Sequence, residues 1–267
     1  NITDPDIVPY IPDGIGNSTD RQRIPAVLII PGGAFRRLVY NFEGEDVAKW
    51  LNSMGIAAFV LECRLPSDEH DNAEDVPLID AMRAMRVIRG RAQEFGIDEA
   101  KIGVMGFSAG GFMAALLSTA YESDVYADYK YKDEYDKLSA RPDFAVCSYP
   151  VISIDDCIEA GKRYMSEEQV LERISDSKAK ILHKYNPDKL VRPDMPPVFI
   201  CETDDDRTTL SENSVGFYMA ARKAGVSAEL HIFRTGGHGY GCGDDFAQTG
   251  EWKVLFTKWI KSIGIIS

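Results

Sequence analysis

The sequence predicts an α/β fold with a mostly parallel central sheet and helices on both faces. Three observations support this prediction. Short apolar runs alternate along the chain with longer segments of helical periodicity. Residues 25–31 (PAVLIIP) form a continuous apolar run between prolines, which is typical of a buried parallel strand. Strands that alternate with helices build crossover units, and these units cover both faces of a sheet.

The expected elements follow one another in order. Residues 1–24 are rich in Pro, Gly and Asp, which indicates an edge segment and a loop before the first buried strand. Short apolar runs predict further strands at 56–62, 101–106, 143–150, 196–203 and 227–233. Apolar positions at helical spacing predict helices at 43–55, 77–96, 109–120, 211–225 and 246–261. Gly96 is expected to end the second of these helices.

Residues 155–192 interrupt this alternation. The segment is polar, has a helical pattern and lies between two expected core strands. We interpret it as an insertion over the carboxyl ends of the strands and a candidate lid. A decoration packed on the side of the fold is the alternative. Because the chain has 267 residues and no internal repeat, we expect a single domain over residues 1–267.

Composition and charge exclude several classes of protein. The formal net charge of −12 disfavours a nucleic-acid partner and an anionic membrane surface, since both require a basic face. No apolar run approaches the roughly 20 residues of a membrane-spanning helix. The five cysteines form no CxxC pair, which favours buried thiols in a reducing, cytoplasmic compartment. A disulfide between Cys201 and Cys242 is the alternative, and the first residue, Asn1, leaves a removed leader open.

A G-x-S-x-G motif lies at 106–110, between an expected strand and an expected apolar helix. A serine on such a sharp turn is held in a strained conformation with its hydroxyl exposed above the sheet. Gly106 and Gly110 have no Cβ to collide across the turn. The motif therefore predicts that Ser108 is a nucleophile. A helix N-cap is the alternative, because serine is also favoured there.

A nucleophilic serine needs a base, and the chain offers four histidines. His70 lies in an acidic loop, His183 in the expected insertion and His231 inside an expected strand. His238 lies in a glycine-rich loop (TGGHGYG) just after that strand, where the backbone is free to present an imidazole. Elimination therefore favours His238 as the base.

The residue that orients the histidine should follow the preceding strand, where Asp204, Asp205 and Asp206 stand in a row. Spacing does not choose among the three. The resulting order of serine, aspartate and histidine along the chain is that of the α/β hydrolases.

An oxyanion hole requires backbone N–H groups directed at the developing negative charge. The amide of Ala109 follows the serine directly, and the loop IIPGGAF after the first buried strand offers Gly32 and Gly33. An ordinary turn between strand and helix is the alternative for this loop. We expect no cofactor and no metal, because no dinucleotide, P-loop or HExxH pattern is present.

From about Pro25 to its end, the chain resembles bacterial α/β-hydrolase esterases of the acetyl-xylan esterase type, and the wider lipase/esterase group that includes hormone-sensitive lipase-like enzymes. The resemblance is carried by blocks such as IIPGGAF, VMGFSAGGFMAALLS, PPVFICETDDD and ENSVGFYMAARKAGVSAELHIFRTGGHGYG. It implies Ser108 as nucleophile, His238 as base and Asp206 as acid, with Asp205 as the alternative acid. The implied oxyanion amides are those of Gly33 and Ala34, in addition to Ala109.

Three features depart from the family pattern. Ala34 replaces a glycine, Glu202 stands where many relatives have histidine, and residues 155–192 are longer than usual. These departures affect which substrate the resemblance implies, and they leave the implied catalytic residues unchanged.

The resemblance implies a serine carboxylesterase that hydrolyses short-chain acyl esters, acetyl esters in particular, on sugars or xylo-oligosaccharides. A prolyl-oligopeptidase-like peptidase and a non-catalytic binding protein are the alternatives. Five aromatic residues near the motif loops are expected either to line the substrate pocket or to lie in the core: Phe35, Tyr40, Phe107, Tyr149 and Tyr240.

Overall fold

The computed structural model describes residues 2–14, 23–66, 70–127, 129, 132–163, 165–166, 168–170, 180–243 and 248–267. Within these residues, seven strands form one sheet in the order β1-β3-β2-β4-β5-β6-β7. β1 pairs antiparallel with β3 at one edge, and the other described pairs are parallel. The strands are β1 (Asp6–Tyr10), β2 (Ile24–Ile30), β3 (Ala57–Glu62), β4 (Ile97–Phe107), β5 (Ala145–Ser148), β6 (Val198–Thr203) and β7 (Ala228–Phe233).

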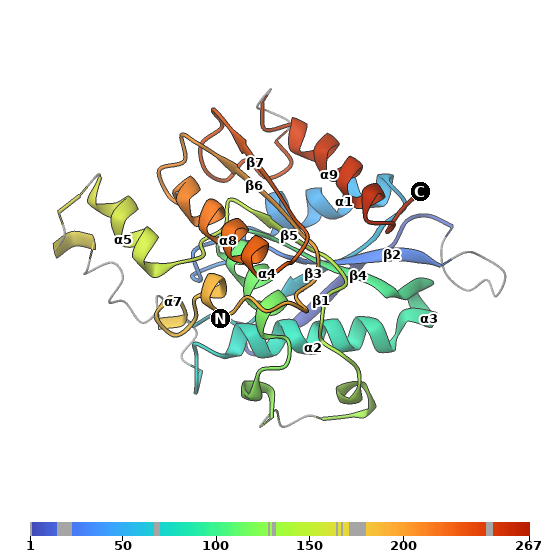
Figure 1. Ribbon diagram of the computed structural model, residues 1–267. Coiled ribbons are helices and arrows are strands. Elements are labelled where there is room, and N and C mark those ends of the chain that lie inside the picture. Colours follow the sequence, from blue (N-terminus) through green and yellow to red (C-terminus); the bar gives the residue numbers. More distant parts are fainter. Residues whose placement is uncertain are drawn as a thin grey trace.

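Helices cover both faces of this sheet (Figure 1). The main ones are α1 (Asp46–Ser53), α2 (Val76–Gly90), α3 (Ala92–Phe95), α4 (Ala109–Ala120), α8 (Ser211–Lys223) and α9 (Glu251–Ser262). Side chains of α1 and α9 pack in one hydrophobic cluster, and those of α2, α4 and α8 pack in a second. Alternate residues of β2 enter the two clusters, with Val27 in the first and Leu28 in the second. This is the expected α/β fold with helices on both faces of the sheet.

Several element boundaries differ from the sequence prediction. The helix expected at 43–55 begins as a π-helix, Asn41–Glu45, and continues as α1. The helix expected at 77–96 breaks after Gly90, a residue of low helix propensity, and Gly96 ends α3 with φ 68°. β4 begins four residues earlier than expected. The closing helix begins at Glu251, after Gly250, rather than at residue 246.

The expected insertion lies between β5 and β6. Its described parts include α5 (Ile154–Lys162), α7 (Lys180–Lys184) and a short 3₁₀ turn, Pro187–Lys189. Residues 164, 167 and 171–179 lie outside the described residues. At the end of α7, Lys184 and Tyr185 contact the carboxylate of Asp75, the residue before α2. A lid and a side decoration therefore both remain open as predictions for this segment.

Cys63, Cys147, Cys201 and Cys242 are buried thiols, and the side chain of Cys157 lies outside the described residues. The alternative of a disulfide between Cys201 and Cys242 is wrong. Among the helices that the structure describes, none combines the length and the apolar character needed to cross a membrane.

Candidate active site

Ser108 lies on the turn between β4 and α4, with φ 53° and ψ −117°. A positive φ is uncommon for a residue with a side chain and marks a strained turn. The glycines on either side make the turn possible. A Cβ on Gly106 would lie 1.9 Å from the carbonyl oxygen of Gly110, and one on Gly110 would lie 1.9 Å from that of Ile30. Ser108 occupies the N-cap position of α4, but its side chain makes no capping hydrogen bond there, so capping is not what its hydroxyl does.

The Ser108 hydroxyl instead meets the imidazole of His238. The Ser108 Oγ and His238 Nε2 atoms are 2.9 Å apart, and His238 Nδ1 lies 2.6 Å from Asp206 Oδ2. His238 follows β7 in a loop where Gly236, Gly237 and other glycines have positive φ. Ser108, His238 and Asp206 therefore form one hydrogen-bonded chain, which we call the Ser–His–Asp chain.

Asp206 is nearly fully buried, and both of its carboxylate oxygens accept hydrogen bonds. Oδ1 accepts hydrogen bonds from the backbone N–H groups of Thr208 (2.7 Å) and Thr209 (2.9 Å). Oδ2 accepts from the Thr209 hydroxyl (2.9 Å) as well as facing His238. Burial by itself raises the pKa of Asp206, but the contact with His238 and the backbone donors outweigh burial and hold that pKa below its usual value. The carboxylate therefore stays ionised beside the histidine.

Asp205 has a different place. It is exposed, and its Oδ1 accepts hydrogen bonds from the backbone N–H groups of Gly236 (2.9 Å) and Gly237 (2.8 Å). The structure thus brings Asp206, and not Asp205, to the imidazole of His238. Two of the other three histidines make contacts elsewhere: His70 with the carbonyl of Ile2, and His231 with Glu229 in β7.

The loop that follows β2 lies against Ser108. A Cβ on Gly32 would lie only 2.9 Å from Ser108 Cβ, which shows how closely the backbone approaches the serine. Gly33, Ala34 and Phe35 all have positive φ (130°, 56° and 57°). The Gly33 carbonyl accepts hydrogen bonds from the backbone N–H groups of Arg36 and Arg37, which closes a tight turn. The donor roles of the Gly33, Ala34 and Ala109 amides stay predictions.

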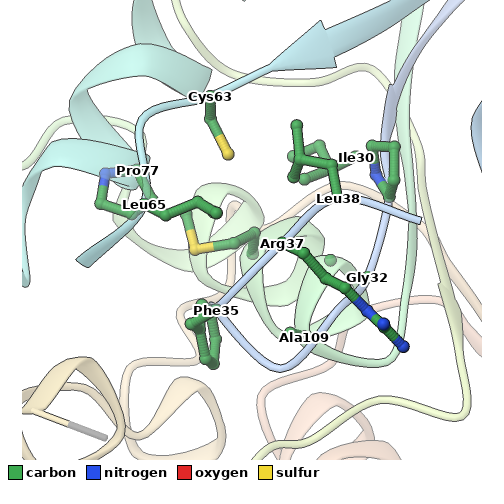
Figure 2. Close-up of a pocket in the computed structure, with 12 residues that line it drawn as sticks. Ile30, Gly32, Phe35, Arg37, Leu38, Cys63, Leu65, Pro77 and Ala109 are labelled. Carbon is green, nitrogen blue, oxygen red and sulfur yellow. The ribbon is translucent and has the colours of Figure 1, made fainter. Parts of the chain in front are cut away.

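Two of the five aromatic residues line surface hollows. Phe35 lines a small, mostly apolar pocket together with Gly32 and Ala109. Figure 2 shows this pocket between the loop that carries Phe35 and the segment that carries Leu65. Tyr40 lines a second hollow of about 390 Å³, which shares Arg37, Leu38 and Leu65 with this pocket. A position near the substrate therefore remains a prediction for Phe35 and Tyr40.

Phe107, Tyr149 and Tyr240 do not line the substrate pocket. All three are fully buried in the cluster that includes α1 and α9, because their side chains point to that face of the sheet. The Tyr149 ring meets the His238 ring edge to face, with centroids 5.0 Å apart. The core alternative thus holds for these three residues, and Tyr149 supports the histidine from behind.

Sequence reasoning missed Glu43. This side chain is 3% exposed, and its Oε2 accepts a hydrogen bond of 2.7 Å from the backbone N–H of Gly32. A signal was present in the sequence: Glu43 precedes the buried residues Val47 and Leu51 by four and eight positions, so it shares their helical face. A carboxylate on an apolar helix face needs buried donors.

Comparisons with known proteins agree with this fold and site. The family model described as BD-FAE matches residues 15–220. An acetylxylan esterase of Xylanibacter ruminicola is 31% identical over 240 residues, covering 89% of this chain and 45% of that protein. Endo-1,4-beta-xylanase B of Butyrivibrio fibrisolvens is 31% identical over 227 residues, covering 85% of this chain and 34% of that protein. The chain thus spans less than half the length of these two relatives.

Solved structures agree over a larger share of both chains. An acetyl ester-xyloside bifunctional hydrolase from Caldicellulosiruptor lactoaceticus has a TM-score of 0.80 and 38% identity, covering 100% of this chain and 91% of that chain. The propionate-bound esterase Est2 of Thermogutta terrifontis has a TM-score of 0.76 and 25% identity, covering 99% of this chain and 91% of that chain. The resemblance to α/β-hydrolase esterases is confirmed: the chain has the α/β-hydrolase fold and belongs to the BD-FAE family.

Proposed function

We propose that the protein is a serine carboxylesterase that works through an acyl-enzyme. The observation that carries this proposal is the Ser–His–Asp chain, with Ser108 on a strained turn and an ionised Asp206 behind His238. The esterases among its relatives and structural neighbours support the same activity.

The mechanism follows from this geometry. Ser108 Oγ attacks the ester carbonyl while His238 Nε2 takes its proton, and Asp206 orients and stabilises the imidazolium. The backbone amides of Gly33, Ala34 and Ala109 stabilise the tetrahedral oxyanion, at about 3 kcal/mol per donor. His238 then protonates the leaving alcohol as the C–O bond breaks. Water, deprotonated by His238, then attacks the acyl carbonyl on Ser108. The bond from the acyl carbon to Ser108 Oγ breaks, His238 returns its proton to Oγ, and the acid leaves.

We propose acetyl esters of sugars or xylo-oligosaccharides as the substrates. Two relatives support this class by name, the acetylxylan esterase and the acetyl ester-xyloside hydrolase. The buried thiols of Cys147 and Cys201 support a reducing, cytoplasmic location for this activity.

Ser108→Ala tests the proposal. We expect hydrolysis of p-nitrophenyl acetate to fall to background, a loss of the order of 10⁶-fold in kcat, because no other group can form the acyl-enzyme. Ser118→Ala is the matched control: Ser118 is a buried serine in α4, the helix that follows Ser108, and its hydroxyl donates to the Ala114 carbonyl. A fluorophosphonate probe should label the wild type and the control but not Ser108→Ala.

Unchanged turnover by Ser108→Ala would refute the assignment of the nucleophile. The substrate class is tested in the same assay with esters from acetyl to octanoyl and with an acetylated xylo-oligosaccharide. We expect the highest kcat/KM for acetyl esters. A preference for octanoyl esters would contradict the proposed substrate class and leave the esterase chemistry standing.

A further inference from the structure

A buried carboxylate connects the two loops that flank Ser108. Glu43 Oε2 accepts the backbone N–H of Gly32 at 2.7 Å, and Glu43 Oε1 accepts the hydroxyl of Tyr149 at 2.9 Å. The Tyr149 oxygen in turn accepts the backbone N–H of Gly241 at 3.0 Å. Gly32 leads into the expected oxyanion amides, and Gly241 lies three residues after His238. Two side chains, Glu43 and Tyr149, thus link the oxyanion loop to the histidine loop.

The two donors that face Glu43, the Gly32 N–H and the Tyr149 hydroxyl, both need an oxygen acceptor. A Cβ on Gly32 would lie 2.7 Å from Glu43 Oε2 and 2.9 Å from Ser108 Cβ, so carboxylate, loop and serine are in close contact. Both carboxylate oxygens of Glu43 receive a donor, and a glutamine could accept at only one of them. Its NH₂ group would face either the Gly32 N–H or the Tyr149 hydroxyl, and one buried donor would lose its acceptor.

Tyr149 shows a second sign of constraint. Its φ of 37° is unusual for an aromatic residue, and its ring packs edge-on against the His238 ring. Burial raises the pKa of Glu43, while the donors Tyr149 and Gly32 and the charge of His238 lower it, with burial the largest effect. A carboxylate kept in this costly position at the site is typical of a functional role.

We propose that Glu43 is a positioning residue that, through Tyr149, sets the oxyanion loop and the histidine loop relative to each other. This inference rests on the proposed esterase function. The carboxylate touches no substrate; it acts by fixing Gly32, and hence the Gly33 and Ala34 amides, at the distance from His238 that the transition state needs. Its contribution therefore belongs to the transition state rather than to substrate binding.

The test compares Glu43→Gln, Tyr149→Phe and the double variant with the wild type on p-nitrophenyl acetate. We expect each single variant to lower kcat about 10- to 100-fold while KM changes less than about twofold, because displaced donors weaken only the transition state. The double variant should lose much less than the product of the two single losses, because both break one network.

The matched control is Tyr126→Phe, which removes another hydroxyl bonded to a carboxylate, that of Asp136, where Tyr126 packs against Arg86 of α2. We expect it to lower the melting temperature without changing kcat. If Glu43→Gln and Tyr149→Phe likewise alter only the melting temperature, Glu43 is merely structural and the inference fails. If the two losses multiply in the double variant, the coupling between the loops fails. Ser108→Ala is measured in the same assay. If Ser108→Ala keeps its activity, the proposed esterase function itself is overturned. If Ser108→Ala is inactive while Glu43→Gln is fully active, only the inference about Glu43 is overturned.

Discussion

Asp205 and Asp206 are neighbours in the chain, yet they hold different partners. Asp206 points inward to His238, and its other oxygen is held by two backbone N–H groups of the following turn. Asp205 points outward and holds the backbone of Gly236 and Gly237, which starts the histidine loop. One residue therefore orients the imidazole, and the other fixes the loop that carries it.

Isosteric substitution separates these two roles. Asp206→Asn should lower kcat by a factor of the order of 10⁴, because an amide favours the wrong imidazole tautomer and brings no charge. Asp205→Asn should stay within about tenfold of wild type, since the amide oxygen can still accept both backbone N–H groups. Initial rates with p-nitrophenyl acetate, together with melting temperatures, measure both. Equal losses in the two variants would contradict the assignment of Asp206.

At the scale of elements, the turn from β4 into α4 depends on two glycines that no side chain can replace. The ideal Cβ positions at Gly106 and Gly110 each lie 1.9 Å from a carbonyl oxygen of the backbone, and backbone cannot move aside as a flexible side chain would. Gly216, in the middle of α8, has nothing within 4 Å of its Cβ position.

Alanine substitutions therefore have opposite expected effects. Gly106→Ala and Gly110→Ala should each lower the free energy of unfolding by about 3 kcal/mol or more, through overpacking against backbone. Gly216→Ala should raise it by about 0.5–1 kcal/mol, because alanine is the better helix former. Urea unfolding followed by circular dichroism measures all three. If Gly106→Ala is as stable as wild type, the backbone around residue 106 has room for a Cβ and the close approach to Gly110 is contradicted.

The strands β2, β3, β5 and β6 could be predicted because they are buried on both faces, so that their apolar runs are continuous, as in β2. The break after Gly90 and the late start of α9 at Glu251 could not, because apolar periodicity continues across both points and local chain geometry decides them. The π-helical turn that starts at Asn41 could not be predicted either, since no simple pattern of apolar residues marks a π-helix.

At the scale of the whole molecule, Ser108, Asp206 and His238 could be proposed from sequence because each follows a strand, and parallel strands end at one edge of the sheet. The choice between Asp205 and Asp206 needed coordinates, since it depends on side-chain direction. Glu43 and Tyr149 needed the packed structure, because their contacts join segments 106 residues apart. For Phe107 and Tyr240 the sequence left pocket and core both open, because closeness in sequence to a loop does not say which face of the sheet a side chain takes.

A buried carboxyl group next to the Ser–His–Asp chain makes the stability of the whole chain depend on pH. Glu202 is fully buried at the end of β6, where burial and the nearby charge of Asp206 raise its pKa well above the usual 4.5. The folded chain therefore keeps a proton on Glu202 that the unfolded chain releases above its ordinary pKa. As pH rises between these two pKa values, folding stability falls by about 1.4 kcal/mol per pH unit from this group. The lowered pKa of Asp206 acts in the opposite direction, with stability lost as pH falls.

Glu202→Gln removes the titrating proton and keeps the shape of the neutral side chain, which can still accept the Thr203 N–H and meet Ser214. The free energy of unfolding of Glu202→Gln, relative to wild type, should therefore rise as pH increases from about 4.5, by about 1.4 kcal/mol per unit, until the folded pKa is reached. Urea titrations from pH 4.5 to 8 measure this difference, with the exposed Glu212→Gln on α8 as the matched control. A constant difference between Glu202→Gln and wild type across that range would mean that Glu202 is already ionised in the folded chain, and that Asp206 shares its buried surroundings with a second negative charge.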